Sequence, residues 1–170
     1  VTYAVIVQNT GGSSSTYALR DTPQFDTDVT INSGTFNGYA SGQMQTSGST
    51  ILNSGTSING GATHTYNISF NVNLNLNDAP GATGDNVYTS CENPGNNPMA
   101  GPFKGLYNKA DLDRNADGSF ELTDDACGDL PPNVILRKDF GTVVTNGNGS
   151  YTVTYAVIVQ NTGGSSSTYA

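Results

Sequence analysis

The stretch YNISFNVNLNL, residues 66–76, decides the fold class. Apolar side chains occupy every second position, and every position between them carries Asn or Ser. An alternation of period two is typical of a β-strand with one buried and one solvated face. The pattern therefore predicts one long strand whose core-facing residues are Tyr66, Ile68, Phe70, Val72, Leu74 and Leu76.

A second alternating stretch lies near the C-terminal end of the chain. It places Tyr151, Val153, Tyr155, Val157 and Val159 on one face. The preceding letters Asn146-Gly147-Asn148-Gly149 are typical of a tight hairpin turn, because Asn and Gly tolerate the positive φ that such turns require. We therefore expect a hairpin of residues 134–144 with residues 151–159, and a buried stripe on the second strand.

Weaker strand patterns complete the fold prediction. They cover residues 16–20, 29–36, 44–52, 105–112 and 119–127, and the turn Asn115-Ala116-Asp117-Gly118 separates the last two. No segment shows a helical period. Seven to nine strands joined by turns of Gly, Asn and Ser predict an all-β, immunoglobulin-like sandwich of two antiparallel sheets.

The chain contains an internal repeat. Residues 1–18, VTYAVIVQNTGGSSSTYA, recur without a mismatch as residues 153–170, which gives a period of 152 residues. Tyr151 and Thr152 continue the alternation ahead of the second copy, so we expect Val1 to lie in mid-strand, within a longer polypeptide. The alternative is a chain engineered with overlapping ends.

The repeat predicts the domain organisation. Residues 1–131 form the body of one module, and residues 132–170 form the first strands of the next, with Pro131-Pro132 as the linker. The hairpin of residues 134–159 then has two candidate positions. It opens the next module of one continuous chain, which we favour, or it is donated into the sheet of a separate neighbouring subunit.

Composition limits the classes of partner. Only 12% of the residues are charged, and six basic against fourteen acidic residues give a formal net charge of −8. Nucleic acids and anionic membranes both require clustered Lys and Arg, so neither is expected as a partner. No apolar run approaches the roughly 20 residues that span a bilayer, so we expect no direct membrane insertion in this segment.

The two cysteines, Cys91 and Cys127, permit one intrachain disulfide. In a chain rich in Thr and Asn and poor in Lys, a disulfide indicates an oxidising, extracellular location. The alternative is a pair of buried thiols. The long loop of residues 77–103 contains few apolar residues to hold it in place, and a bridge from Cys91 would anchor it.

Several segments together resemble a known family. They are YTVTYAVIVQNTGG at 151–164, STYALRDTPQF at 15–25, GATHTY at 61–66, GLYNKADL at 105–112 and DDACGDLP at 124–131. Their order is similar to that in bacterial conserved-repeat modules of the "domain of unknown function eleven" type. Those are immunoglobulin-like units arranged in tandem in very large surface and secreted proteins. The resemblance also implies that Cys91 pairs with Cys127.

An acidic stretch is the candidate site. Seven of the fourteen acidic residues lie between Asp111 and Asp129. Oxygen-bearing residues follow the spacing of a calcium-binding loop with a glycine, Gly118, at its sixth position. The candidate calcium ligands are Asp113, Asn115, Asp117, Ser119, Glu121 and Asp124. The alternative is a plain hairpin turn at Asp117-Gly118 whose acidic side chains are solvated.

Catalytic interpretations find little support. His64 has no acid or nucleophile at a telling spacing and is interpreted as a surface or capping residue. Crowded turn carboxylates are poor evidence for a glycosidase cleft. We therefore expect a non-catalytic structural module of an extracellular surface fibre, stalk or filament, whose partners are neighbouring copies of the repeat. The alternative is an adhesin module that binds a glycan or protein through exposed aromatic residues.

Overall fold

The computed structural model describes residues 1–76, 84, 87–91 and 105–169. Most of the long loop expected at residues 77–103 lies outside this described part. The chain divides into two compact units, Val1–Asp129 and Leu130–Ala170.

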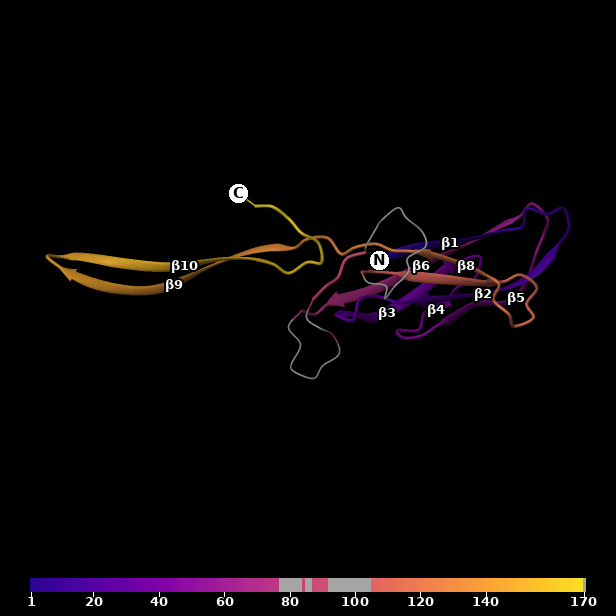
Figure 1. The fold of residues 1–170 in the computed structure, drawn as a ribbon, viewed down its shortest axis with the longest axis horizontal. Helices are drawn as coiled ribbons and strands as arrows, with labels where there is room; N and C mark the ends of the chain where they lie inside the picture. Colours follow the sequence, from indigo (N-terminus) through magenta and orange to yellow (C-terminus); the bar gives the residue numbers. More distant parts are fainter. Residues whose placement is uncertain (77–83, 85–86, 92–104, 170) are drawn as a thin grey trace. The chain divides into compact units, whose positions relative to one another are not determined.

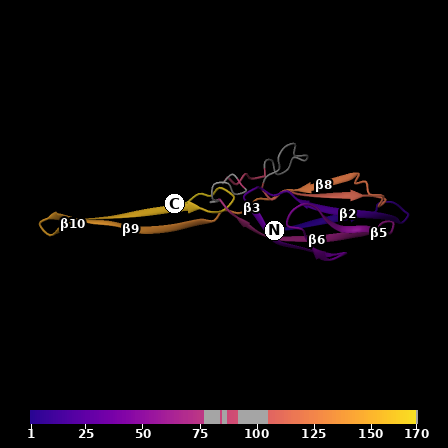
Figure 2. The same ribbon diagram turned by 90° about the horizontal axis from the view of Figure 1, so that it is seen from below.

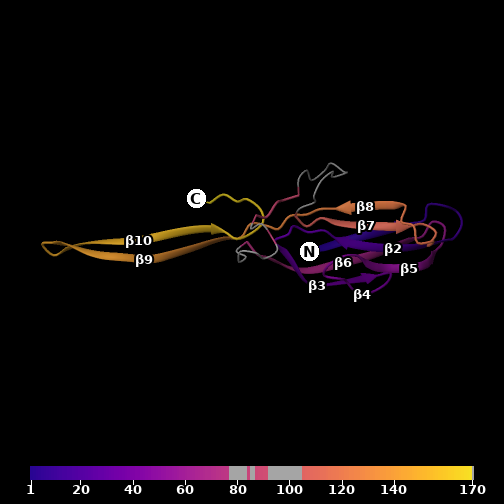
Figure 3. The same ribbon diagram turned by 60° about the horizontal axis from the view of Figure 1, so that its bottom comes forward.

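The first unit contains two four-stranded antiparallel sheets. One sheet has the order β1 (Thr2–Gln8), β6 (Thr63–Leu74), β3 (Val29–Gly38), β4 (Gly42–Gln43). The other has the order β5 (Thr50–Ile58), β2 (Ser15–Pro23), β7 (Asn108–Asp113), β8 (Leu122–Ala126). Figures 1, 2 and 3 show the two sheets as the layers of a sandwich. The predicted immunoglobulin-like all-β fold is confirmed.

The core lies between these sheets and follows the alternation in β6. Tyr66, Ile68 and Phe70 are buried, whereas Asn67 and Asn71 between and beyond them are exposed. From the other sheet, the core cluster receives Tyr17, Leu19, Leu52 and Ile58. Burying an apolar side chain of this size stabilises the fold by about 1.5–3 kcal/mol. The long strand is thus the central element of its sheet, paired with β1 on one side and β3 on the other.

The predicted strand 105–112 begins only at Asn108 in β7, and two further strand predictions are wrong in their bounds. The stretch 44–52 is not one strand: Gln43 ends β4, Thr50 begins β5, and Gly48 adopts a φ of 74° between them. The predicted strand 119–127 begins only at Leu122, because the residues before it belong to the acidic turn. In both cases small polar residues that are compatible with a strand form a turn instead.

The second unit contains the predicted hairpin. Strand β9 (Val134–Gly147) pairs antiparallel with β10 (Ser150–Asn161). The turn residues Asn148 and Gly149 have φ values of 51° and 74°, the left-handed conformation that a two-residue hairpin turn requires.

The prediction of a buried stripe on β10 is wrong for this unit. Tyr151, Val153, Tyr155, Val157 and Val159 are 37–64% exposed. A two-stranded hairpin provides no second sheet of its own to cover either face. In the first copy of the same sequence, by contrast, Val7 is 7% exposed, and Tyr3 and Val5 pack against the core. The stripe is therefore correct for the sequence but requires a covering sheet.

Candidate functional site

The acidic turn connects β7 to β8 and is organised around Asp113. Its Oδ2 accepts a hydrogen bond from the Gly118 N–H at 2.7 Å, and its Oδ1 accepts from the N–H groups of Asn115 and Asp117 at 3.1 and 3.3 Å. Gly118 has a φ of 97°, which a residue with a side chain rarely adopts. One buried carboxylate therefore closes this turn.

The electrostatics of Asp113 agree with that role. Burial alone would raise the pKa of its carboxyl group, but backbone N–H donors outweigh burial, and the net pKa lies below the usual value. The donors are those of Gly118, Asn115, Asp117 and Ala116. Hydrogen bonds to a carboxylate favour its charged form. Asp113 is thus an anion at neutral pH.

Three of the candidate calcium ligands converge in the structure. Asp113, Asp117 and Glu121 each place one carboxylate oxygen within 4.8 Å of the others. The oxygens also have protein donors: Asn115 Nδ2 bonds to Asp117 at 2.8 Å, and the Arg114 N–H bonds to Glu121 at 2.9 Å. This geometry brings three hard oxygen donors to one side of a tight turn, as a hard cation prefers.

Asp124 does not belong to this cluster. It lies in β8 opposite Ala110, beyond the acidic turn. In a helix-flanked calcium loop, the twelfth residue returns to the ion at the start of the second helix. Here a strand begins at Leu122 and carries Asp124 along the sheet. Ser119 remains in the turn, where its N–H donates to Asp117 Oδ1 at 2.9 Å.

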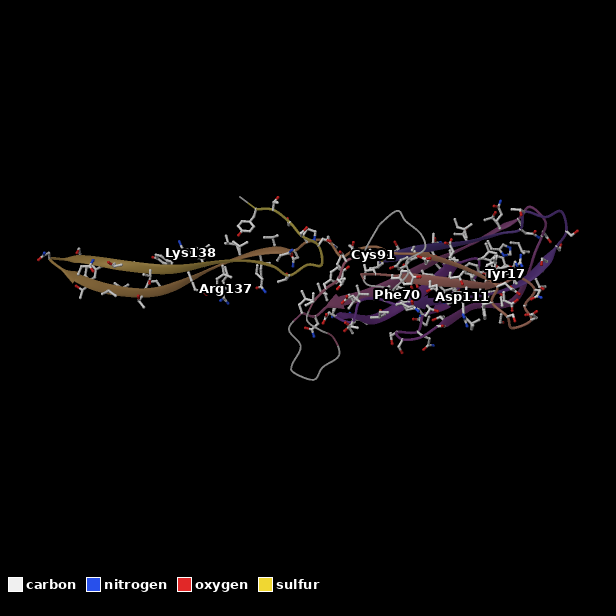
Figure 4. The ribbon with its side chains drawn as sticks, in the orientation of Figure 1. Tyr17, Phe70, Cys91, Asp111, Arg137 and Lys138 are labelled. Carbon is white, nitrogen blue, oxygen red and sulfur yellow. A yellow bond between two sulfur atoms is a disulfide. The ribbon has the colours of Figure 1, made fainter. Side chains whose placement is uncertain are left out.

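Cys91 and Cys127 form a disulfide, as the sequence predicted. Cys91, which is labelled in Figure 4, is buried, and its N–H donates to Asp129 Oδ1 at 2.8 Å. Two further carboxylates hold the residues just before it: Asp28 accepts from the Val87 N–H and Asp26 from the Thr89 N–H, both at 3.1 Å. The segment 87–91 is therefore held by side-chain acceptors as well as by the bridge.

A polar network inside the sandwich was not predicted. The Tyr17 hydroxyl lies 2.6 Å from the Tyr66 hydroxyl and 2.8 Å from His64 Nδ1. Asn53 Nδ2 donates to the Tyr66 hydroxyl at 2.9 Å. The ring of His64 also stacks on Tyr39, with 3.5 Å between centroids. The interpretation of His64 as an isolated surface or capping residue is thus wrong: it belongs to β6 and links the two sheets.

The outer face of the second sheet carries an ion-pair cluster around Asp111. This carboxylate accepts from Arg20 Nε at 2.8 Å and Thr123 Oγ1 at 2.7 Å, and lies 3.2 Å from Lys109 Nζ. Burial alone would raise the pKa of Asp111, but these donors and the charge of Lys109 lower it overall. Asp111, which is labelled in Figure 4, thus joins three neighbouring strands, which is a structural role.

The inner face of the same sheet carries a further buried acid, Asp21. Its side chain is 0% exposed, and Asn108 Nδ2 donates to its Oδ1 at 3.0 Å. Its Oδ2 has no hydrogen-bond partner, the one buried side-chain atom of which this holds among the described residues. Burial raises its pKa, the Asn108 hydrogen bond lowers it and Asp111 raises it, to about 7 overall. The sequence did contain a signal for this acid: Tyr17, Leu19 and Asp21 occupy alternate positions of β2 and therefore share one face.

Comparison with protein-family models, curated proteins and solved structures finds no match to this chain. Within the part of the chain that the structure describes, no helix has the length and apolar character needed to cross a membrane.

Proposed function

We propose that the chain is a non-catalytic structural module of an extracellular surface fibre, stalk or filament, in which copies of the repeat follow one another. The observation that carries this proposal is the mismatch-free recurrence of residues 1–18 as residues 153–170. A module that buries its own core and contacts adjacent copies adds length to a polymer without needing a reaction centre. The disulfide is compatible with the proposed extracellular location.

Five of the carboxylates described above have structural partners, which also favours this proposal. Asp113 closes a turn, Asp111 joins three strands, and Asp26, Asp28 and Asp129 hold the segment before Cys91. General acid and base catalysis instead requires groups that are free to exchange protons with a substrate.

The adhesin alternative depends on exposed aromatic residues. Phe140 and Tyr155 are 63% and 55% exposed on the hairpin and contact each other edge to face. The residue that corresponds to Tyr155 in the first copy is Tyr3, which packs against Phe25 and Phe70. The counterpart of Tyr155 is thus a core residue, so the exposed pair on the hairpin is of the type that a second sheet would cover. No specific observation favours a glycan site.

The mass of the natively produced polypeptide tests the proposal. After full denaturation and reduction, we expect a very large species, and after limited proteolysis a ladder with steps of one 152-residue period. A tandem array is cut most readily in its exposed linkers, here among the residues that flank Pro131-Pro132. A single species near 17.6 kDa would contradict the continuous array. Screening one module against glycans tests the adhesin alternative separately.

We further propose that the acidic turn binds calcium weakly, through Asp113, Asp117 and Glu121. A site of roughly millimolar affinity, typical of extracellular modules, gains about 1 kcal/mol from 5 mM calcium. For a unit of this size that gain raises the Tm by about 3–5 °C. The shift is modest because backbone donors already order the turn without a cation.

Two variants make the calcium prediction specific. Glu121→Gln removes a clustered carboxylate and is expected to abolish the calcium-dependent rise in Tm. Asp124→Asn is the matched control, because Asp124 is outside the cluster, and should keep the rise. If calcium raises the Tm equally in both variants, or does not raise the Tm of the unmodified protein, the calcium proposal is wrong. The acidic turn is then a plain hairpin turn with solvated acids.

A further inference from the structure

One nine-residue sequence has two different strand partners in this protein. Residues 1–9 and residues 153–161 are identical. In the first copy, β1 pairs with β6, from Thr2 opposite Ser69 to Gln8 opposite Thr63. In the second copy, β10 pairs with β9, from Val153 opposite Val143 to Asn161 opposite Val134. Because a strand has two edges, β6 and β9 can pair with the same strand only if they use different edges.

They use opposite edges. Val1 exchanges hydrogen bonds with Phe70, and Asn9 bonds to Ala62 and Gly61, so the odd-numbered positions of the first copy point their backbone groups toward β6. In the second copy, the Thr162 N–H donates to the Asn133 carbonyl. Thr162 corresponds to Thr10, an even-numbered position. Because backbone groups alternate between the two edges of a strand, β9 takes the edge that β6 leaves free.

Among the described residues of the first unit, no strand pairs with that edge. Strand β1 is the last strand in the order of its sheet. The backbone N–H and C=O groups of its even-numbered positions, Thr2, Ala4, Ile6 and Gln8, point away from β6. An unpaired edge of this kind is a template for a further strand.

An apolar groove of about 530 Å³ lies beside the open edge. Its walls are β1 from Tyr3 to Val7 and the inner face of β2, β7 and β8. Leu122, a residue of β8 that lines this groove, is 46% exposed. A leucine on the inner side of a sandwich is ordinarily covered by the facing sheet. The exposure of Leu122 therefore indicates that one more strand, added beside β1, would cover β8.

Three acids line this groove, Asp21, Asp124 and Asp125, and the first two belong to one row across the sheet. Asp21 pairs with Ala110 across β2 and β7, and Ala110 pairs with Asp124 across β7 and β8, so the three residues form one row on one face of the sheet. All three line the groove, and the small Ala110 separates the two carboxylates. Asp21 is fully buried and its Oδ2 has no partner. A buried carboxyl group beside a second acid is stabilised either by holding its proton or by a nearby cation, and a cation in this groove would favour the charged form.

We propose that the open edge of β1 and its groove accept a strand with the sequence of β9, Val134–Gly147, from a second copy of the repeat, and that Lys138 of this strand pairs with Asp21 and Asp124. The inference deepens the proposed function, on which it rests, by naming the surface through which one copy completes the next.

The register of the donated strand follows from the hairpin. Lys138 lies opposite Val157, which corresponds to Val5, and Leu136 and Phe140 lie opposite the counterparts of Val7 and Tyr3. Directly opposite residues share a face. Leu136, Lys138 and Phe140 therefore enter the groove together. The donated strand thus brings one cation between two apolar residues into the groove. The row that it meets on β8, Leu122, Asp124 and Ala126, has one anion between two apolar residues.

The position of the ammonium group supports this pairing. Lys138 Nζ lies 4.5 Å above the ring of Tyr155, the counterpart of Tyr3. Burial raises the pKa of the Tyr3 hydroxyl, and the negative charge of Asp21 raises it further, so Tyr3 and Asp21 are neighbours. Figure 4 labels Arg137 and Lys138 on the hairpin. Arg137 pairs with Asp139 at 2.9 Å on the other face and is not available to the groove.

The test adds the missing strand to the full chain. Residues 133–152 are placed directly before Val1, which reproduces the natural junction of Thr152 with Val153. We expect the Tm of the first unit to rise by about 10 °C relative to the unextended chain. Amide exchange at Ala4, Ile6 and Gln8 should slow by about 100-fold or more, whereas amides at Tyr3 and Val5, which already face β6, should change little.

Two variants of the added strand separate pairing from charge. Lys138→Met in the added copy keeps the strand, so the even-numbered amides should stay protected. The titration midpoint of Asp21, followed by carboxyl NMR, should then remain near its value in the unextended chain. With Lys138 present, the midpoint should fall by about two pH units or more. Deleting Thr152 from the added copy shifts the register by one residue and should remove the gain in Tm.

Exchange at Ala4, Ile6 and Gln8 that is as fast in the extended chain as in the unextended one would overturn the strand proposal. Protection of these amides with an unchanged Asp21 midpoint would overturn the role of Lys138. Both readouts need only one module, so they are independent of the polymer mass that tests the proposed function.

Discussion

Loss of the Cys91–Cys127 disulfide is expected to lower the free energy of unfolding of the first unit by about 3–4 kcal/mol. The bridge joins residues 36 positions apart, and closing a loop of this length restricts the unfolded chain. A double variant, Cys91→Ala with Cys127→Ala, should show this loss in urea unfolding followed by the near-ultraviolet signal of the tyrosines. Reductant added to the unmodified protein should produce a similar loss.

The control for this prediction is Asp129→Asn. That variant weakens the hydrogen bond to the Cys91 N–H but keeps the bridge, so its loss should be about 1–2 kcal/mol, smaller than that of the double variant. A double variant that loses less than Asp129→Asn would mean that Asp26, Asp28 and Asp129 hold the segment by themselves. Intact-mass measurement before and after reduction confirms that the bridge is present in the starting material.

The strands that the sequence predicts well are those with a strict alternation of side chains. Strand β6 is the clearest example, because its apolar residues lie on one face and its Asn residues on the other. The failures around residues 44–52 and 119–121 have a common cause. Ser, Thr, Gly and Asn occur in both the strands and the turns of this chain, so composition cannot locate the boundary between them.

The acidic site was only partly accessible to sequence reasoning. Spacing within one turn placed Asp113, Asp117 and Glu121 together, because these residues are near in sequence and on a tight loop. Spacing could not place Asp124, because its position depends on whether the turn leads into a helix or a strand. The row of Asp21, Ala110 and Asp124 was out of reach, since it depends on the register of three strands that are distant in sequence.

Stability of the first unit should fall as the pH rises from about 4 to about 7, because of Asp21. In the unfolded chain this carboxyl group loses its proton near the ordinary value of 3.8, whereas in the folded state its pKa is raised to about 7. Between these values the folded state binds more protons than the unfolded state. Stability therefore decreases with increasing pH across this window, by as much as about 4 kcal/mol.

The acids with lowered pKa values act in the opposite direction and in a different window. Asp111 and Asp113 contribute stability that is present above their ordinary pKa and is lost as the pH falls through their lowered values. Their effect is thus confined to pH values below about 4. The interval from pH 4 to 7 therefore isolates Asp21, which shares the groove with Tyr3 of β1, Asn108 of β7, and Asp124 and Asp125 of β8.

Asp21→Asn is the decisive variant for this prediction. The substituted amide keeps an oxygen for Asn108 Nδ2 but cannot ionise, so urea unfolding from pH 4 to 8 should lose its slope. At pH 8 the variant should be more stable than the unmodified protein, by about 2–4 kcal/mol. Asp124→Asn is the matched control in the same row, and because that side chain is exposed, the slope should persist. A slope that survives in Asp21→Asn would assign the pH dependence to another group.

In the chain extended by residues 133–152, the slope should be suppressed without any substitution at Asp21, because the ammonium of Lys138 then stabilises the carboxylate that burial alone disfavours.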